Sequence, residues 1–197
     1  SARFVASSLC SSSDAINASE ALGQAIWMAR HGRSKDDISF AMQNDFEINT
    51  RISEQDIRAE LSGATKEPIV VNGTETGEHY YRESGKMARD SLTLLTGALH
   101  AFFKGDSFED SVRHAVALGG ASNTVTSIAG ALAEAFHGSV PEKISGLCAT
   151  YISSDIKSGI KSYESICIQK KESTKSLPKV PDNSFNIIKL NDGQKMF

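Results

Sequence analysis

The chain has 197 residues, a length that suffices to bury one hydrophobic core. Its 21 basic and 24 acidic residues give a net charge of −3, which argues against nucleic acid or an anionic membrane as a partner. No long apolar run is present, so we expect no membrane-spanning helix. Three cysteines without Cys-x-x-Cys spacing, Cys10, Cys148 and Cys167, favour reduced thiols and a cytoplasmic location.

Two helices are predicted near the N-terminus. Ser13-Asp14 precedes apolar residues that recur at intervals of three and four up to Ala29, and Gly32 follows as a stop. This pattern predicts an amphipathic helix of about 18 residues. Ser34 and Asp37 have the spacing of a capping box for a second helix, so the sequence predicts a short helix-turn-helix pair.

Residues 58–83 lose the helical periodicity and collect turn residues, which is typical of a loop with a small hairpin at 69–74. Tyr80, Tyr81 and Arg82 follow that hairpin. Tyrosine faces can stack on an adenine and an arginine fork can pair with a phosphate, so these three are candidate substrate-binding residues. The alternative is that they are ordinary loop residues with no ligand.

Further helices are predicted in the second half of the chain. Apolar spacing indicates a buried helix over about 84–104, and Ser107 with Asp110 has capping-box spacing for the next. The helix at 125–137 is rich in small residues that permit close packing, so we expect it to cross the middle of a bundle. Pro141 opens a last helix. No strong strand pattern competes, so the predicted fold class is all-α.

A pair of glycines, Gly119 and Gly120, turns the chain sharply into the helix that follows. Two carboxylates just after such a turn would make a natural Mg²⁺ site, because this ion is held by hard oxygen donors and negative charge. The chain has Ala121 and Asn123 at these positions. The structural interpretation of the segment is a helix cap, in which Ser122 or Asn123 accepts a backbone N–H.

Other polar residues favour structural interpretations. Glu134 and His137 have the spacing of a di-iron ligand pair, but a second such pair is absent, so a solvated glutamate and a helix-terminal histidine are favoured. His100 and His114 are predicted as hydrogen-bonded core or boundary groups. The charged run 35–37 is predicted to be solvated.

Three segments, 20–38, 107–120 and 119–141, resemble the ADP-ribosylglycohydrolase family. The family pattern Gly-Gly-Asp-Ser/Thr-Asp-Thr, followed by a small-residue helix and a Gly-x-Ile/Val-Pro turn, is similar to the segment from Gly119 to Pro141. The resemblance covers about residues 5–150 and corresponds to the C-terminal half of the family fold.

The resemblance implies a partial, all-α ADP-ribosylglycohydrolase-like helical bundle with an irregular C-terminal tail. We accordingly predict a helical domain over 1–155 and a linker and tail over 156–197. The Lys/Ser/Pro-rich composition of residues 169–179 is also typical of a linker.

The family reaction is Mg²⁺-dependent hydrolysis of the glycosidic bond between ADP-ribose and a modified residue. The resemblance therefore implies Mg²⁺ as a cofactor and an ADP-ribose-like ligand. The two family aspartates that bind paired Mg²⁺ ions correspond to Ala121 and Asn123, so the transfer leaves Asn123 and Thr124 as candidate metal ligands and no catalytic residue. We expect a degenerate hydrolase in which Mg²⁺ binding is weak or lost.

Two alternatives remain open. The chain is a non-catalytic scaffold that binds a ligand or a partner, or it is one part of a split hydrolase completed by another polypeptide. Because the family's first half normally packs against the second, we expect a homo-oligomer or a partner that supplies the missing half. Neither nucleic acid nor a membrane is an expected partner.

Overall fold

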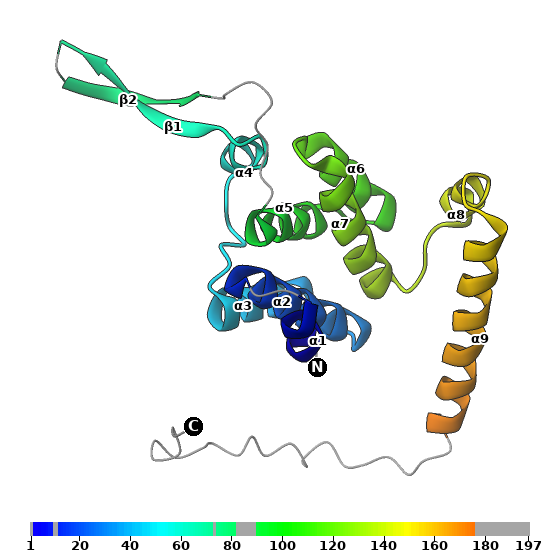
Figure 1. Ribbon diagram of the computed structural model, residues 1–197. Coiled ribbons are helices and arrows are strands. Elements are labelled where there is room, and N and C mark those ends of the chain that lie inside the picture. The colour runs from blue at the N-terminus through cyan, green and yellow to red at the C-terminus, as the bar shows by residue number, and fades with distance from the viewer. Residues whose placement is uncertain (1, 10–11, 73, 82–89, 176–197) are drawn as a thin grey trace, which may run out of the picture. The chain divides into compact units, whose positions relative to one another are not determined.

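A computed structural model of the chain (Figure 1) describes residues 2–9, 12–72, 74–81 and 90–175. Two compact units are present, residues 1–145 and residues 146–197. The described residues are mostly helical, which confirms the predicted fold class, and one β-hairpin interrupts the helices. None of the described helices is long and apolar enough to cross a membrane.

The elements of the first unit are α1 (Ala2–Leu9), α2 (Ser13–Arg30), α3 (Lys35–Phe46), α4 (Glu54–Leu61), β1 (Thr65–Val71), β2 (Thr74–Tyr81), α5 (Ser91–Lys104), α6 (Phe108–Leu118) and α7 (Ser122–His137). The division between the units falls within α8 (Glu142–Ala149), and α9 (Ser154–Lys175) belongs to the second unit.

Side-chain caps set where several helices begin. Ser12 caps the 18-residue helix α2, Ser34 and Asp37 form a reciprocal capping box at α3, and Ser107 accepts the Asp110 amide at α6. The box at α3 and the Ser107 cap at α6 lie where the sequence predicted helix starts, although at α6 the Asp110 carboxylate accepts the Asp106 amide, so that the reciprocal box is not formed. A cap needs residues only three positions apart, so it forms without a tertiary contact.

Two helix boundaries differ from the sequence prediction. Residues 58–61, assigned to a loop, belong to α4, whose cap Ser53 accepts the Asp56 amide at 3.1 Å. The predicted helix over 84–104 begins only at Ser91, because Asp90 caps α5 by accepting the Thr93 amide at 2.8 Å. Residues 84–89 lie outside the described residues.

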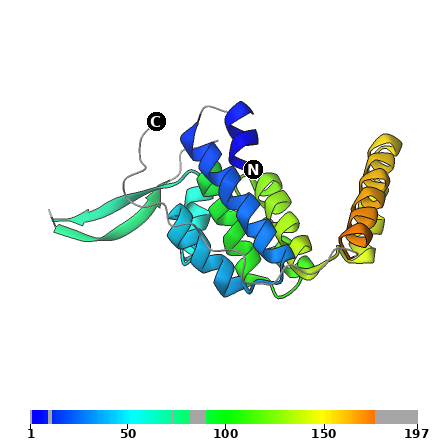
Figure 2. The same ribbon diagram turned by 90° about the horizontal axis from the view of Figure 1, so that it is seen from below.

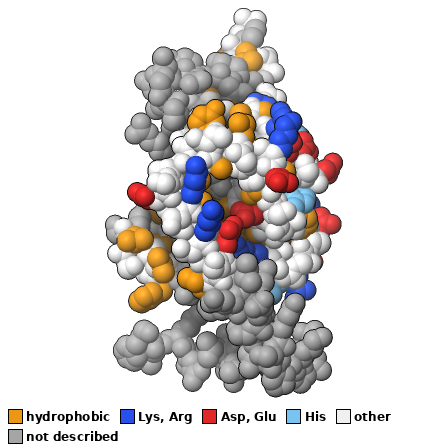
Figure 3. Space-filling view, turned by 90° about the vertical axis from the view of Figure 1, so that its right-hand side faces the viewer, with side chains coloured by type: hydrophobic (Ala, Val, Ile, Leu, Met, Phe, Trp, Pro, Cys, Tyr) orange, Lys and Arg blue, Asp and Glu red, His pale blue; other side chains and the backbone are white. Residues whose placement is uncertain are grey.

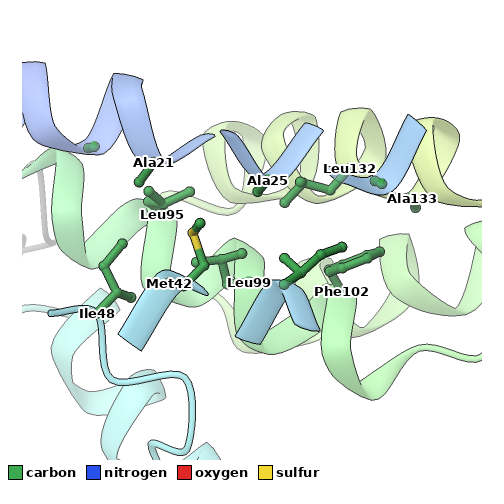
Figure 4. Close-up of a cluster of buried hydrophobic side chains, with 12 residues drawn as sticks. Ala21, Ala25, Met42, Ile48, Leu95, Leu99, Phe102, Leu132 and Ala133 are labelled. Carbon is green, nitrogen blue, oxygen red and sulfur yellow. The ribbon is translucent and has the colours of Figure 1, made fainter. Parts of the chain in front are cut away.

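The core consists of two clusters that share α5 and α7. The first draws on α2, α3, α5 and α7, and the second on α4, α5, α6 and α7. The two shared helices lie side by side in the views of Figures 1 and 2, as expected for the small-residue helix predicted to cross the bundle. The first cluster (Figure 4) includes Ala21, Ala25, Met42, Ile48, Leu95, Leu99, Phe102, Leu132 and Ala133.

Alternation of small and large residues on α5 fits this double role. Leu95, Leu99 and Phe102 are buried in the first cluster, and Ala98 and Ala101 in the second. Full burial of a leucine or phenylalanine contributes about 1.5–3 kcal/mol, so the first cluster holds the larger share of the stabilisation on α5. The alanines let the neighbouring helices approach closely.

The hairpin predicted at 69–74 is present and extends further on both sides. β1 and β2 pair antiparallel, from Val71 opposite Thr74 to Thr65 opposite Tyr81. Asn72 has φ +51°, the left-handed conformation that asparagine tolerates and that a tight hairpin turn requires. The β-branched and aromatic residues along both strands favour extended backbone.

In the second unit, α9 covers residues 154–175, so residues 156–175 of the predicted linker and tail, including 169–175 of the Lys/Ser/Pro-rich stretch, are helical. Ser153 lies just before this helix, and its hydroxyl accepts the Ile156 amide at 3.5 Å. Residues 176–179 lie outside the described residues. The predicted domain boundary at residue 155 stays a prediction.

His100 is the buried polar side chain of α5, as the sequence prediction of a core or boundary histidine requires. The ring hydrogen bonds the backbone of Ile52, while its Nε2 has no partner among the described residues. Burial lowers the pKa of His100 below its usual range, and the positive charge of Lys104 adds to that shift. The neutral imidazole is therefore the form that the folded protein favours.

We predict that acidification from pH 7 to pH 5 destabilises the protein through His100. Because the folded-state pKa is lowered, the unfolded chain binds more protons below about pH 6.5, so the free energy of unfolding falls as the pH drops through this range. The variant His100→Gln should show a shallower fall, measured by urea denaturation at each pH. His137 is present in both proteins and cancels in the comparison; equal slopes would contradict the assignment to His100.

Candidate functional site

The turn between α6 and α7 is built on two left-handed glycines. Gly119 has φ +79° and donates its N–H to the Val116 carbonyl, and Gly120 has φ +62°. A Cβ on Gly120 would overlap the Leu61 carbonyl oxygen and lie 2.7 Å from the Leu61 carbonyl carbon. The turn therefore rests directly on the end of α4, and this close approach requires glycine.

The start of α7 corrects the predicted capping role of Ser122 or Asn123. Ala121 occupies the N-cap position, and no side chain caps the helix. Its carbonyl instead accepts the amides of Thr124 at 3.0 Å and Val125 at 3.2 Å. The prediction was wrong because the helix begins one residue earlier than that cap needs, which places Ser122 and Asn123 inside the first turn.

The donors at this turn do not suit a pair of Mg²⁺ ions. Ala121 contributes a methyl group, while Asn123 and Thr124 are exposed and offer only neutral oxygens. Paired Mg²⁺ ions are held by carboxylates, which balance their charge. Among the residues the structure describes, no group of three or more His, Cys, Asp or Glu side chains could hold a metal ion. The assignment of Asn123 and Thr124 as metal ligands stays a prediction.

The second candidate segment lies at the end of the hairpin that follows α4. Tyr80 and Tyr81 end β2 and pair with Lys66 and Thr65 at the base of the hairpin. Thr65 follows Leu61 by four residues, so its Cα lies within about 15 Å of the Leu61 Cα by chain length. With the spacing of a strand pair of about 5 Å added, the Tyr81 Cα lies within about 20 Å of the helix end on which the Gly-Gly turn rests. Arg82 lies outside the described residues, and ligand contact by the three residues stays a prediction.

Lys35 corrects the prediction that the run 35–37 is solvated. The side chain is half-buried, and its Nζ donates to the carbonyl of Phe102 at 2.8 Å and to the carbonyl of Gly105. The last carbonyls of a helix lack partners within it, so the ammonium satisfies the C-terminus of α5. Its neighbours at 36 and 37 are exposed, as predicted.

The electrostatics around Lys35 are those of a structural cation. Burial lowers the pKa of Lys35 below its usual range, and the carboxylates of Asp106 and Asp110 oppose that shift. The ammonium also lies 4.9 Å from the centre of the Phe102 ring, within the range of a cation–π interaction. Burial and the charge of Lys35 lower the pKa of His137, which lies in the last turn of α7 as predicted. Backbone carbonyls and aromatic faces occupy this lysine, so its role is to hold α3 against α5.

A second charged group lies on α4. Glu54 pairs with Arg58 at 2.7 Å and with Lys104 at 3.0 Å, and the hydrogen bond from Arg58 is the main reason that the pKa of Glu54 falls to about 2. Arg58 also donates to the Ala117 carbonyl, near the end of α6. A carbonyl two residues before the Gly-Gly turn is thus already bonded to a cation.

A comparison with known proteins agrees with the family resemblance of the Gly-Gly turn and its flanking helices. A model of the ADP-ribosylglycohydrolase family matches residues 2–167, and the chain therefore belongs to this family. No curated protein and no solved structure matches the chain significantly.

We predict that Gly120→Ala destabilises the protein more than Gly119→Ala. Both substitutions force an L-residue into positive φ, which costs about 1–3 kcal/mol. Only the Gly120 variant also overlaps the Leu61 carbonyl, which adds about 1–3 kcal/mol, whereas a Cβ on Gly119 meets nothing within 4 Å. Urea denaturation of the two variants isolates the packing contribution, and equal costs would show that the contact with α4 is not tight in solution.

We predict that Asn123→Ala changes the free energy of unfolding by less than about 0.5 kcal/mol, because the side chain caps nothing. The matched control Ser107→Ala removes a cap and should cost about 1 kcal/mol. Mg²⁺ should leave the melting temperature of the parent and of Asn123→Ala unchanged. Stabilisation by Mg²⁺ in the parent that disappears in the variant would instead identify Asn123 as a metal ligand.

Proposed function

We propose that this chain is a catalytically degenerate member of the ADP-ribosylglycohydrolase family that serves as a helical scaffold. The observation that carries the proposal is the start of α7, where Ala121 contributes a methyl group and Asn123 a neutral amide. The Gly-Gly turn that presents these residues is intact and tightly packed. The two glycines of the family pattern are present, whereas the side chains at 121 and 123 lack the carboxylates of that pattern.

The argument against catalysis is electrostatic. Two Mg²⁺ ions bring four positive charges, and the family resemblance implies that aspartates balance them. The turn offers no carboxylate of its own, and the nearby α6 carbonyl of Ala117 is bonded to the Arg58 guanidinium. A carboxylate-free turn would neither concentrate Mg²⁺ nor orient a metal-held water toward a glycosidic bond.

Ligand binding without hydrolysis is part of the proposal. Tyr80, Tyr81 and Arg82 would contact an ADP-ribose-like ligand through ring stacking and a phosphate pair. The chain length between Leu61 and the hairpin base is compatible with this assignment, because it keeps the end of β2 within about 20 Å of the residue on which Gly120 rests. The scaffold would then recognise the family ligand without cleaving it.

A split hydrolase completed by another polypeptide is the alternative. It is favoured by large hydrophobic side chains that are exposed on the first unit, among them Phe4, Leu9 and Val116. Such residues are commonly covered by a partner or by a second copy. Nucleic acid is not the partner we propose, since the net charge is −3 and both acidic and basic side chains are visible in Figure 3. Cys148 is a free, exposed thiol, in keeping with the cytoplasmic location that we propose.

We predict that the chain releases no ADP-ribose from ADP-ribosyl-arginine or ADP-ribosyl-serine peptides in the presence of Mg²⁺. The expected rate equals that of a buffer control, because the turn cannot hold the metal pair. The double variant Ala121→Asp, Asn123→Asp is the matched test of the missing charge, and Mg²⁺ should raise its melting temperature but not that of the parent. Turnover by the parent that EDTA abolishes would overturn the pseudoenzyme proposal.

A further inference from the structure

The first unit contains an open cavity between α2 and α3 that lies apart from the Gly-Gly turn. Its volume is about 640 Å³, and its lining comes from these two helices and the turn that joins them. The two helices pack side by side (Figures 1 and 2). Small-molecule sites commonly occupy 300–1,000 Å³, so the cavity is large enough for a compact organic ligand.

Two exposed aromatic rings line this cavity, one from each helix. Trp27 is 55% exposed and Phe40 is 71% exposed, although both are large apolar side chains. Trp27 stacks on His31 with ring centroids 4.1 Å apart and an interplanar angle of 26°. The imidazole is itself held, because its Nδ1 lies 2.7 Å from the Trp27 carbonyl oxygen. One face of the indole is therefore backed by a fixed ring, and the side chain also lines the cavity.

Two of the three polar side chains that line the cavity already have hydrogen-bond partners. Gln24 donates to the Asp45 carboxylate at 2.8 Å, and Asp37 accepts the Ser34 amide at 3.2 Å within the α3 capping box. Arg33 lines the same cavity, and its guanidinium has no hydrogen-bond or ion-pair partner among the described residues. The Arg33 guanidinium can therefore bind an anionic group of a ligand.

We propose that the cavity binds an organic molecule with a planar aromatic ring and a single anionic substituent. The ring stacks between the surfaces of Trp27 and Phe40, with Met28 and Ala41 as further apolar lining, and the anion pairs with Arg33. The Asp37 carboxylate lines the cavity as well, and its repulsion of an anion grows with the charge of that anion, so a single negative charge, matched to the one arginine of the lining, is favoured. No lining residue comes from α6 or α7, so the site stands independently of the catalytic status of the family turn.

The chain carries its own reporter for this site, because Trp27 is its single tryptophan. The probe is 4-nitrobenzoate, an aromatic carboxylate that quenches indole fluorescence. The matched ligands are 4-nitrobenzamide, which keeps the ring without the charge, and cyclohexanecarboxylate, which keeps the charge without the aromatic ring. Isothermal titration calorimetry measures all three independently of fluorescence.

We expect saturable quenching by 4-nitrobenzoate and roughly tenfold weaker binding of each matched ligand, which corresponds to about 1.4 kcal/mol. Arg33→Gln should remove the preference for the benzoate over the benzamide, and Phe40→Ala should weaken both aromatic ligands about fivefold. Both replaced side chains are exposed, so the fold should persist. The controls Arg30→Gln and Phe4→Ala remove an exposed guanidinium and an exposed ring outside the cavity and should bind as the parent does.

Three outcomes would overturn the proposal. Quenching that does not saturate, or that is unchanged in Arg33→Gln and Phe40→Ala, would mean that the indole is only exposed to collisions. Equal binding of 4-nitrobenzoate and 4-nitrobenzamide would remove the anionic requirement. A blue shift of Trp27 emission with protein concentration, together with self-association in sedimentation, would assign this face to a protein interface.

Discussion

The bond between the Lys35 ammonium and the end of α5 is the interaction on which the arrangement of the first unit depends. The last carbonyls of a buried helix have no partners within the helix, and leaving them unpaired away from water costs free energy. Lys35 reaches the carbonyls of Phe102 and Gly105 from the first residue of α3. This bond holds α3 against α5, the helix that contributes to both core clusters. The position of α3 in turn sets the position of one wall of the cavity between α2 and α3.

Local signals made a large part of this fold predictable. The capping box at Ser34, the cap at Ser107, the stop at Gly32 and the hairpin around Asn72 depend on residues within a few positions of each other. The start of α5 was set too early because apolar spacing continues upstream of Asp90, whereas the cap is a single side-chain bond. The helix α4 could have been found from Ser53 and Asp56, which are also three positions apart.

The position of the Gly-Gly turn was predictable from the sequence, but the residues that pack against it were not. The two glycines are visible in the sequence, and their positive φ values follow from the sharp turn. The contact of Gly120 with Leu61 spans 59 residues, and the bond from Lys35 to Phe102 spans 67, so no local pattern indicates either. A family resemblance shows which residues of the chain correspond to such a turn. Which groups surround it is a property of the tertiary packing.

The hairpin β1–β2 has a consequence for how the protein avoids self-assembly through its backbone. In a sheet of two strands both are edge strands, and each has an outer row of backbone N–H and C=O groups that the other strand does not bind and to which another chain could add a strand. Pro68 removes one donor from β1, and the irregular register between Ile69 and Val70 bends the same strand. Charged residues, Glu67 and Glu75 among them, recur along both strands and disfavour the approach of a like-charged copy. The sequence of the hairpin itself thus disfavours strand addition, and the part of the chain that the structure describes adds no third strand to the sheet.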